Sequence, residues 1–231
     1  MRAPHRPSPG RVRRAVEHVG SHLEDGFDCE GMWRVYSENE LRLELISCTR
    51  GFGSSCLLYG GQRIPPQFRG VKSLLDERFG SSLGSFEEAR SSPPTPDEFT
   101  SMAEAKAPSD QVYKRSTRWA IQLADLLSVT ESPVDVRAEL VRLIPGLGLV
   151  RASTFLRNVQ YSYSLAILDA PTIRYCSMIG LREVSSSAPC TRRAYGEGEK
   201  AIAKYSKSTG IRPGILQTAV WVVLRLLDRL N

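Results

Sequence analysis

The chain has 231 residues, of which 41% are hydrophobic and 24% charged. It is therefore long enough to bury a sizeable core, and its composition excludes a low-complexity or intrinsically disordered chain. The formal net charge of +6 favours an anionic partner, of which nucleic acid is the commonest.

Residues 1–114 give the weaker structural signals. The predicted elements are a flexible basic tail over 1–10, a helix Pro9–Leu23, a helix opened by the capping box Ser37–Glu40, an exposed Gly- and Ser-rich loop over 48–55, and a helix start at Thr95. Proline and glycine pairs break residues 60–114 into short pieces. We therefore expect an N-terminal helical part over 11–114 whose detail is not predicted.

From residue 115 onward the pattern is plainly helical. Three helices are predicted, with the apolar faces Trp119/Leu123/Leu126/Leu127, Val134/Ala138/Val141/Ile144 after the cap Ser132, and Leu216/Val220/Val223/Leu224/Leu227 from Pro213 on. No segment alternates with a period of two. The predicted fold class is all-α, with a core over 115–231.

Cysteine and histidine usage argues against a metal or redox cofactor. The five cysteines are scattered without a C-x-x-C pair, which disfavours a zinc site or iron–sulfur cluster and predicts reduced thiols. His18 and His22 are spaced to share a metal, but a solvated helix face is favoured. No apolar run reaches the ~20 residues that span a bilayer, and no secretory signal is evident, so we expect a cytoplasmic protein with no membrane partner.

A helix-hairpin-helix is predicted around Pro145-Gly146-Leu147-Gly148. One helix ends near Leu143 and the next starts near Leu149, burying Ala152, Phe155, Leu156 and Val159. The two glycines would allow positive φ angles and a close approach by another molecule. The N–H groups at the start of the second helix would then bind a DNA phosphate without reading sequence. The alternative is an ordinary helical hairpin with a tight turn.

Asp169 follows the apolar run Leu165–Leu168 and precedes a helical pattern, where a helix N-cap is expected. A helix cap alone is one interpretation of this residue. An ionised carboxylate at a helix N-terminus could also serve chemistry.

The hairpin, the Leu-Arg-Asn that ends at Asn158, and Ala-Ile-Leu-Asp169 together resemble the HhH-GPD superfamily of DNA glycosylases, and most closely its archaeal-type 8-oxoguanine DNA glycosylases, the second Ogg subfamily. The similarity covers about 115–231, including Tyr195–Glu199 and Val220-Trp221. It implies two helical subdomains with a base pocket in the cleft between them, a flipped base, and Asp169 as the catalytic carboxylate.

The sequence departs from the family at the position of its catalytic lysine. That residue, two after the second hairpin glycine, is Val150 here, and the neighbouring Arg151 is a poor nucleophile. A monofunctional glycosylase without Schiff-base lyase activity is therefore expected. Asp169-Ala-Pro-Thr172 also differs from the basic residue and histidine usual in relatives, which leaves the base open among oxidised, alkylated or deaminated, and hypermodified foreign (phage) bases.

The resemblance implies further site residues. These are Gly146, Leu147, Gly148, Leu149, Val150, Arg151 and Arg157 for DNA; Arg50 and Phe52 to fill the gap left by the flipped base; Trp221 at the pocket; and the carbonyls of Arg142, Ile144 and Leu147 for a structural Na⁺ or K⁺. For Arg50, Phe52 and Trp221 a structural role is the alternative. The expected partner is double-stranded DNA at the nucleoid, with no obligate protein partner; the rival functions are an inactive DNA-binding module and a purely structural hairpin.

Overall fold

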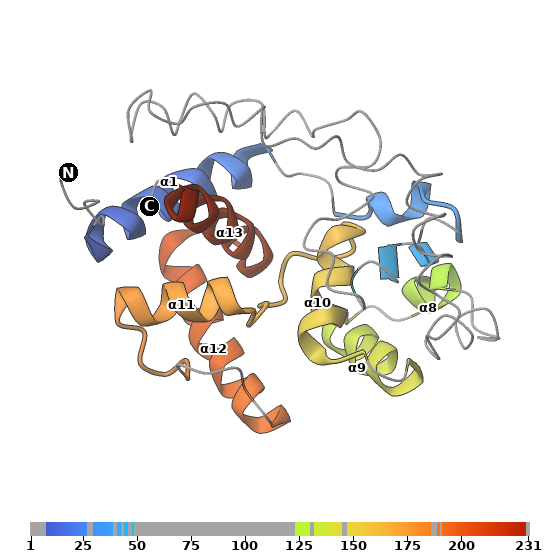
Figure 1. The fold of residues 1–231 in the computed structure, drawn as a ribbon. Helices are drawn as coiled ribbons and strands as arrows, with labels where there is room; N and C mark the ends of the chain where they lie inside the picture. Colours follow the sequence, from blue (N-terminus) through green and yellow to red (C-terminus); the bar gives the residue numbers. More distant parts are fainter. Residues whose placement is uncertain are drawn as a thin grey trace. The chain divides into compact units, whose positions relative to one another are not determined.

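The structure is a computed structural model that describes residues 8–26, 30–38, 41–42, 44–45, 48, 123–129, 132–144, 147–185, 189 and 191–229. Every regular element in these ranges is helical, which confirms the all-α fold class (Figure 1). The helices are α1 (Pro9–Gly26), the 3₁₀ helix η1 (Met32–Val35), α8 (Leu123–Val129), α9 (Pro133–Leu143), α10 (Leu149–Asn158), α11 (Ala170–Ile179), α12 (Arg192–Thr209) and α13 (Pro213–Arg229). None of these helices is long and apolar enough to cross a membrane.

The chain divides into two compact units that do not follow the boundary expected at residue 115. The first unit contains α1 and everything from Tyr163 onward, and the second contains η1, α8, α9 and α10. The reason is that the apolar face of α1 packs against α13, so the first described helix belongs with the last. The tail expected over 1–10 is also shorter, because α1 begins at Pro9.

Helix α13 is the centre of the first unit, where it packs against α1, α11 and α12. All five apolar residues predicted for its buried face are at most 6% exposed, which confirms that prediction. Burying each such side chain contributes about 1.5–3 kcal/mol. Helix α1 approaches the segment between α12 and α13 closely at Gly20, where an added Cβ would lie 2.7 Å from Ile211 Cδ1, so a larger residue would require the Ile211 side chain to shift.

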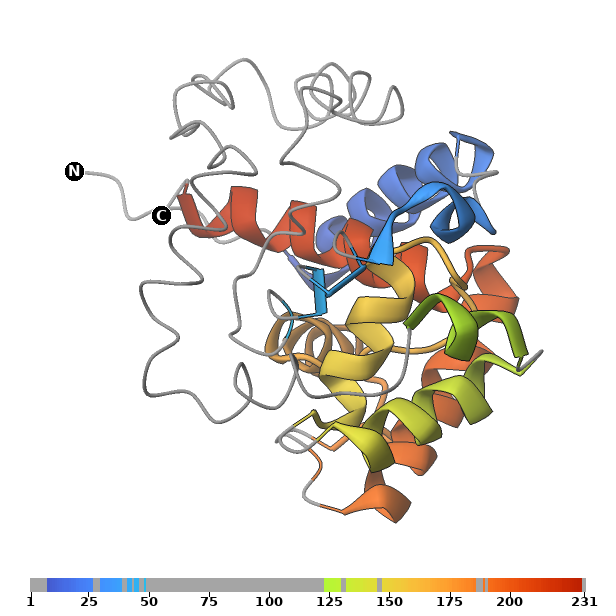
Figure 2. The same ribbon diagram turned by 90° about the vertical axis from the view of Figure 1, so that its right-hand side faces the viewer.

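The second unit contains the paired helices α9 and α10 (yellow-green and yellow in Figure 2). Helix α10 buries the four residues predicted for it. Of the face predicted for α9, Ile144 is buried as expected, but Val134 is 51% exposed and Ala138 is exposed, and Val136 and Leu140 are buried instead. Both sets have helical spacing, and the buried side of the helix also carries Arg137, whose Nη1 donates to Ser153 Oγ of α10 at 3.1 Å.

Glu38, inside the predicted capping box, serves a helix far along the chain. Its two carboxylate oxygens accept hydrogen bonds from the N–H groups of Leu123 at 3.0 Å and Ala124 at 3.1 Å, at the start of α8. An anionic group at a helix N-terminus satisfies backbone donors and complements the helix dipole. The capping-box partner Glu40 lies outside the described residues.

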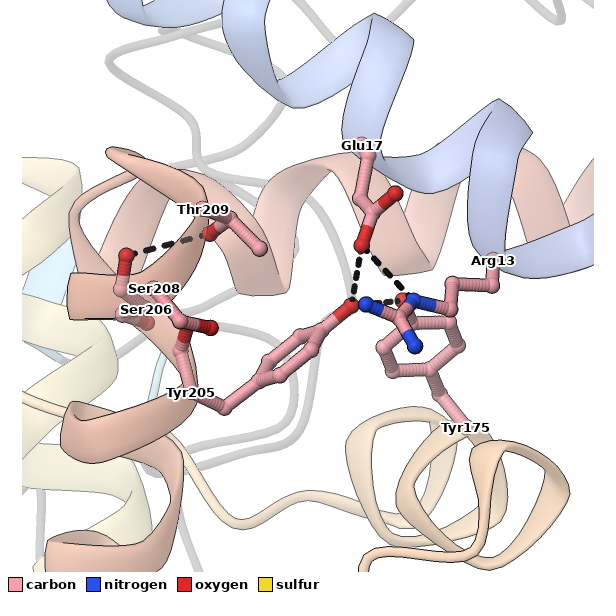
Figure 3. A network of polar contacts seen from close by, with 7 residues as sticks. All are labelled: Arg13, Glu17, Tyr175, Tyr205, Ser206, Ser208 and Thr209. Atoms are coloured by element: carbon pink, nitrogen blue, oxygen red, sulfur yellow. Dashed lines mark hydrogen bonds and ion pairs between the residues drawn. The ribbon is translucent and has the colours of Figure 1, made fainter.

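A polar network joins α1, α11 and α12 in the first unit (Figure 3). Tyr205 Oη donates to Glu17 Oε1 at 2.9 Å, so its contact with Tyr175 Oη, also 2.9 Å, has Tyr175 as donor. Arg13 Nε donates to the same carboxylate oxygen at 2.8 Å, and its guanidinium lies over the Tyr205 ring. Burial raises the pKa of both tyrosines above their usual range, so both hydroxyls keep their protons and the network persists into alkaline solution.

Tyr175→Phe tests this network through the pH dependence of stability. At neutral pH the loss of one buried hydrogen bond should lower the free energy of unfolding by about 1 kcal/mol. The folded pKa of Tyr175 is raised, so its contribution is complete below about pH 10, where the unfolded chain begins to lose tyrosine protons, and falls as the pH rises further. Urea denaturation should therefore show a wild-type advantage that shrinks above about pH 10. Ser208→Ala, an exposed neighbour, should show no such pH dependence; a constant Tyr175 effect would contradict the network.

Candidate functional site

The hairpin turn lies between α9 and α10 in the second unit. Helix α9 ends at Leu143, and the buried Leu147 donates its N–H to the Ile144 carbonyl at 3.1 Å. Gly148 is the N-cap of α10 with φ −88°, so the positive φ expected for this glycine is wrong: an extended N-cap conformation leads directly into the helix. Pro145 and Gly146 lie outside the described residues.

The start of α10 is open to another molecule. Gly148 is exposed, and an added Cβ there would meet nothing within 4 Å, so internal packing does not demand a glycine. No side chain caps this helix, and within the described part of the chain no group accepts from the N–H groups of Leu149 and Val150. Unpaired donors at the positive end of a helix dipole form an anion site.

The side chains predicted to bind DNA differ in their surroundings. Leu149 and Val150 are half-buried in the first turn of α10, and Arg151 is exposed. Arg157 is half-buried at the other end of the helix, where its Nε and Nη2 donate to Asn158 Oδ1 at 3.0 and 2.6 Å. Leu147 is buried, so only its backbone can serve a ligand. Their DNA contacts stay predictions.

Asn158 also anchors α10 within its unit. Its Nδ2 donates to Glu44 Oε1 at 2.6 Å, and Glu44 is fully buried. The thiol of Cys48 lies 3.7 Å from the same carboxylate oxygen. The Leu-Arg-Asn motif that follows the hairpin therefore has a structural use: it connects α10 to a carboxylate in the helical segment around residues 41–48.

Asp169 is the N-cap of α11 in the first unit, as predicted. Its Oδ1 accepts from the Thr172 N–H at 2.9 Å, and its backbone is extended, with φ −84° and ψ 172°. Its Oδ2 accepts from Gln217 Nε2 of α13 at 2.5 Å. Asp169 is half-buried whereas Gln217 is 5% exposed, so the carboxylate accepts from a buried donor and is itself partly exposed.

Gln217 was missed by the sequence analysis. It lies on the buried side of α13, next to Leu216 and one helical turn from Val220, where only apolar residues were expected. A single amide inside an otherwise apolar helix face is the signal that could have identified it, because buried polar side chains need a specific partner.

The segment that leads into Asp169 is fixed by α12. Tyr195 Oη donates to the Ala166 carbonyl at 2.9 Å in a buried contact. Gly198, one turn later, lets α12 approach so closely that an added Cβ would lie 3.0 Å from Leu168 Cδ1. The Tyr195–Glu199 motif thus shapes the backbone immediately before the candidate catalytic carboxylate.

Trp221 follows Gln217 by one turn of α13 and is half-buried, with the Arg225 guanidinium 4.8 Å from the centre of its ring. The arginine covers one face of the ring, and the place of Trp221 at a base pocket stays a prediction. Burial raises the pKa of the Cys176 thiol to about 12, helped by the negative Asp169, so this thiol is inert at neutral pH.

The remaining predicted site residues have no structural test. Arg50, Phe52 and Gly146 lie outside the described residues. The monovalent cation expected at the carbonyls of Arg142, Ile144 and Leu147 stays a prediction. Among the described residues, no three His, Cys, Asp or Glu side chains are grouped to hold a metal ion.

Comparison with known proteins places this arrangement in a family context. Residues 104–211 match the family model of the helix-hairpin-helix 8-oxoguanine DNA glycosylases, which confirms the resemblance seen in the hairpin and Asp169 motifs. A search of curated proteins gave no significant match.

Solved structures show the same fold. The 8-oxoguanine DNA glycosylase of Thermotoga maritima is similar with a TM-score of 0.55 and 22% identity, over 92% of this chain and 93% of that one. The Methanocaldococcus jannaschii 8-oxoguanine glycosylase/lyase, crystallised with a 15mer DNA containing 8-oxoguanine, has a TM-score of 0.53 and 20% identity over 92% and 94% of the two chains.

Tyr195→Phe tests the support beneath Asp169. Loss of the buried hydrogen bond to the Ala166 carbonyl should lower the free energy of unfolding by about 1–3 kcal/mol. Gly196→Ala, in the same turn, is a matched control, because its Cβ would meet nothing within 4 Å. It should leave stability unchanged or raise it by roughly 0.5–1 kcal/mol. Equal melting temperatures for Tyr195→Phe and wild type would contradict this role for the hydroxyl.

Proposed function

We propose, on the premise that residues 104–211 match the 8-oxoguanine DNA glycosylase family, that this chain is a DNA glycosylase that removes a damaged or modified base by hydrolysis. The observation that carries the proposal is Asp169, a partly exposed carboxylate at a helix N-terminus whose two oxygens are fixed by separate donors. A rigid, ionised group of this kind can stabilise positive charge without reorganising during the reaction.

In the proposed reaction the target nucleotide is flipped from the duplex and its glycosidic bond breaks. Positive charge develops on the sugar as the base departs, and the Asp169 carboxylate stabilises it. Water then attacks the sugar carbon, with Asp169 orienting it or accepting its proton. The base leaves with a proton in place of the sugar, and the DNA retains an abasic site.

The hairpin is the proposed binding site for double-stranded DNA. Its support is the N-terminus of α10, where Gly148 is exposed and the N–H groups of Leu149 and Val150 have no acceptor among the described residues. The net charge of +6 fits a polyanionic partner, whose binding should weaken as salt increases. Action on DNA would place the protein in the cytoplasm at the nucleoid.

The proposed enzyme is monofunctional because Val150 offers no amine to attack the sugar. The relative from Methanocaldococcus jannaschii is described as a glycosylase/lyase, so this chain would share base removal with it but not strand cleavage. The relatives make 8-oxoguanine the first base to test; other damaged bases and hypermodified phage bases follow. Mass spectrometry of bases released from genomic and phage DNA identifies the substrate.

Asp169→Asn should abolish base release and leave duplex affinity similar or higher, because it removes the charge but keeps a side chain that can cap α11. The loss should reach at least about 10²-fold in single-turnover rate. Release of the base is followed by mass spectrometry, and affinity by fluorescence anisotropy. If the wild type releases no base from any modified duplex yet binds DNA, the alternative of an inactive binding module is supported.

Borohydride trapping tests the missing lyase step. The wild type should give no covalent adduct with substrate DNA, because a Schiff base requires an amine. Val150→Lys restores the amine at the family's position and should produce a trappable adduct together with strand cleavage. Val150→Met, of similar length without the amine, is the matched control. A trapped wild-type adduct would overturn the monofunctional assignment.

A further inference from the structure

Asp169 makes a second side-chain contact that two other N-cap residues in the described part of the chain, Ser132 and Thr191, do not make. Ser132 and Thr191 cap α9 and α12 with hydroxyl groups, each accepting from one backbone N–H. Asp169 caps α11 in the same way through Oδ1 but also accepts through Oδ2 from Gln217. Capping alone needs only the first of these bonds.

Pro171 explains why the second donor must come from another helix. An N-cap side chain normally accepts from the N–H of the second or third helical residue. The second residue of α11 is Pro171, which has no N–H, and the third is Thr172, whose N–H is used by Oδ1. The second position of α11 therefore has no N–H group that could donate to Oδ2. The amide of Gln217 on α13 donates to Oδ2 instead.

Burial gives Gln217 a specific reason to be an amide. The residue is 5% exposed on a helix face that is otherwise apolar, where a leucine of similar size would pack without needing any hydrogen bond. A buried amide is unfavourable unless it is bonded, and the bond observed here runs to the one carboxylate at the candidate site. The contact with the carboxylate therefore gives this buried position a specific use for an amide.

We propose that Gln217 is a positioning residue for base removal: its amide holds the Asp169 carboxylate in one orientation. This inference rests on the proposed glycosylase function. Two donors on separate helices, α11 and α13, fix both oxygens, so the carboxylate cannot rotate as the charge on the sugar develops.

Gln217→Met and Gln217→Glu test the proposal by different changes at the same position. The methionine keeps the length of the side chain but has no donor, and single-turnover base release should slow by roughly 10²-fold while duplex affinity is unchanged. In Gln217→Glu the introduced carboxyl group can donate to Asp169 Oδ2 only while it is protonated. The rate of base release by Gln217→Glu should therefore fall as the pH rises from about 5 to about 9, because two ionised carboxylates repel each other. A merely structural role would not change the shape of this pH profile.

Thr218→Ala is the matched control on the same helix. It removes one hydrogen bond, from Thr218 Oγ1 to the Gly214 carbonyl, and none of its bonds reaches Asp169. Its rate and pH profile should equal those of the wild type. An equal slowing in Thr218→Ala and Gln217→Met would assign the effect to the stability of α13 and overturn the proposal. If Gln217→Met does not fold, Gln217→Asn, whose amide is one methylene too short, replaces it.

An NMR measurement of the Gln217 side-chain amide separates this proposal from the proposed function. The amide proton resonances should move in Asp169→Asn and stay in place in Thr218→Ala, because only the first change alters the acceptor of the Gln217 hydrogen bond. Unmoved resonances in Asp169→Asn overturn the role of Gln217 whether or not the protein is active. Resonances that move in Asp169→Asn, together with a wild type that releases no base from any duplex, support the contact and overturn the glycosylase.

Discussion

The packing of α13 against α1 and α11 is the constraint on which the candidate catalytic group depends. The apolar face of α13 is buried, and this burial sets both the height and the rotation of the helix. Gln217 lies on the same buried side of α13, so the packing of the core positions its amide next to Asp169. Chemistry and stability are therefore not separate properties of this unit: a substitution that rotates α13 moves the donor away from the carboxylate.

The two functional parts of the molecule are built in opposite ways. Asp169 is surrounded by satisfied contacts, from Thr172, from Gln217 and, beneath the preceding segment, from Tyr195. The N-terminus of α10 instead has donors with no acceptor in the described part of the chain. A fixed carboxylate suits a reaction in which charge appears at one point, whereas open backbone donors suit a ligand that arrives from outside.

Much of this could be predicted from the sequence where the signal is local. The cap at Asp169, the buried face of α10 and the face of α13 follow from spacing alone. The face of α9 could be predicted only in part, because Val134 and Val136 begin equally good apolar patterns. An amide within the apolar face of α13 marked Gln217 as a residue that needs a partner, but the partners of Gln217 and Glu38 could not be predicted, since each acts on a helix distant in the sequence. The pairing of α1 with α13 depends on the whole core.

Pro171 has a consequence for the order in which the parts of the candidate site form during synthesis and folding. Because this proline withdraws one N–H from the first turn of α11, the carboxylate of Asp169 depends on a donor 48 residues further along the chain. A growing polypeptide emerges from its N-terminus, so the hairpin and Asp169 exist well before the helix that carries Gln217. The contacts of the carboxylate are completed only when the last described helix has been made and docked, and a truncated chain would keep the proposed DNA-binding hairpin without a finished candidate site.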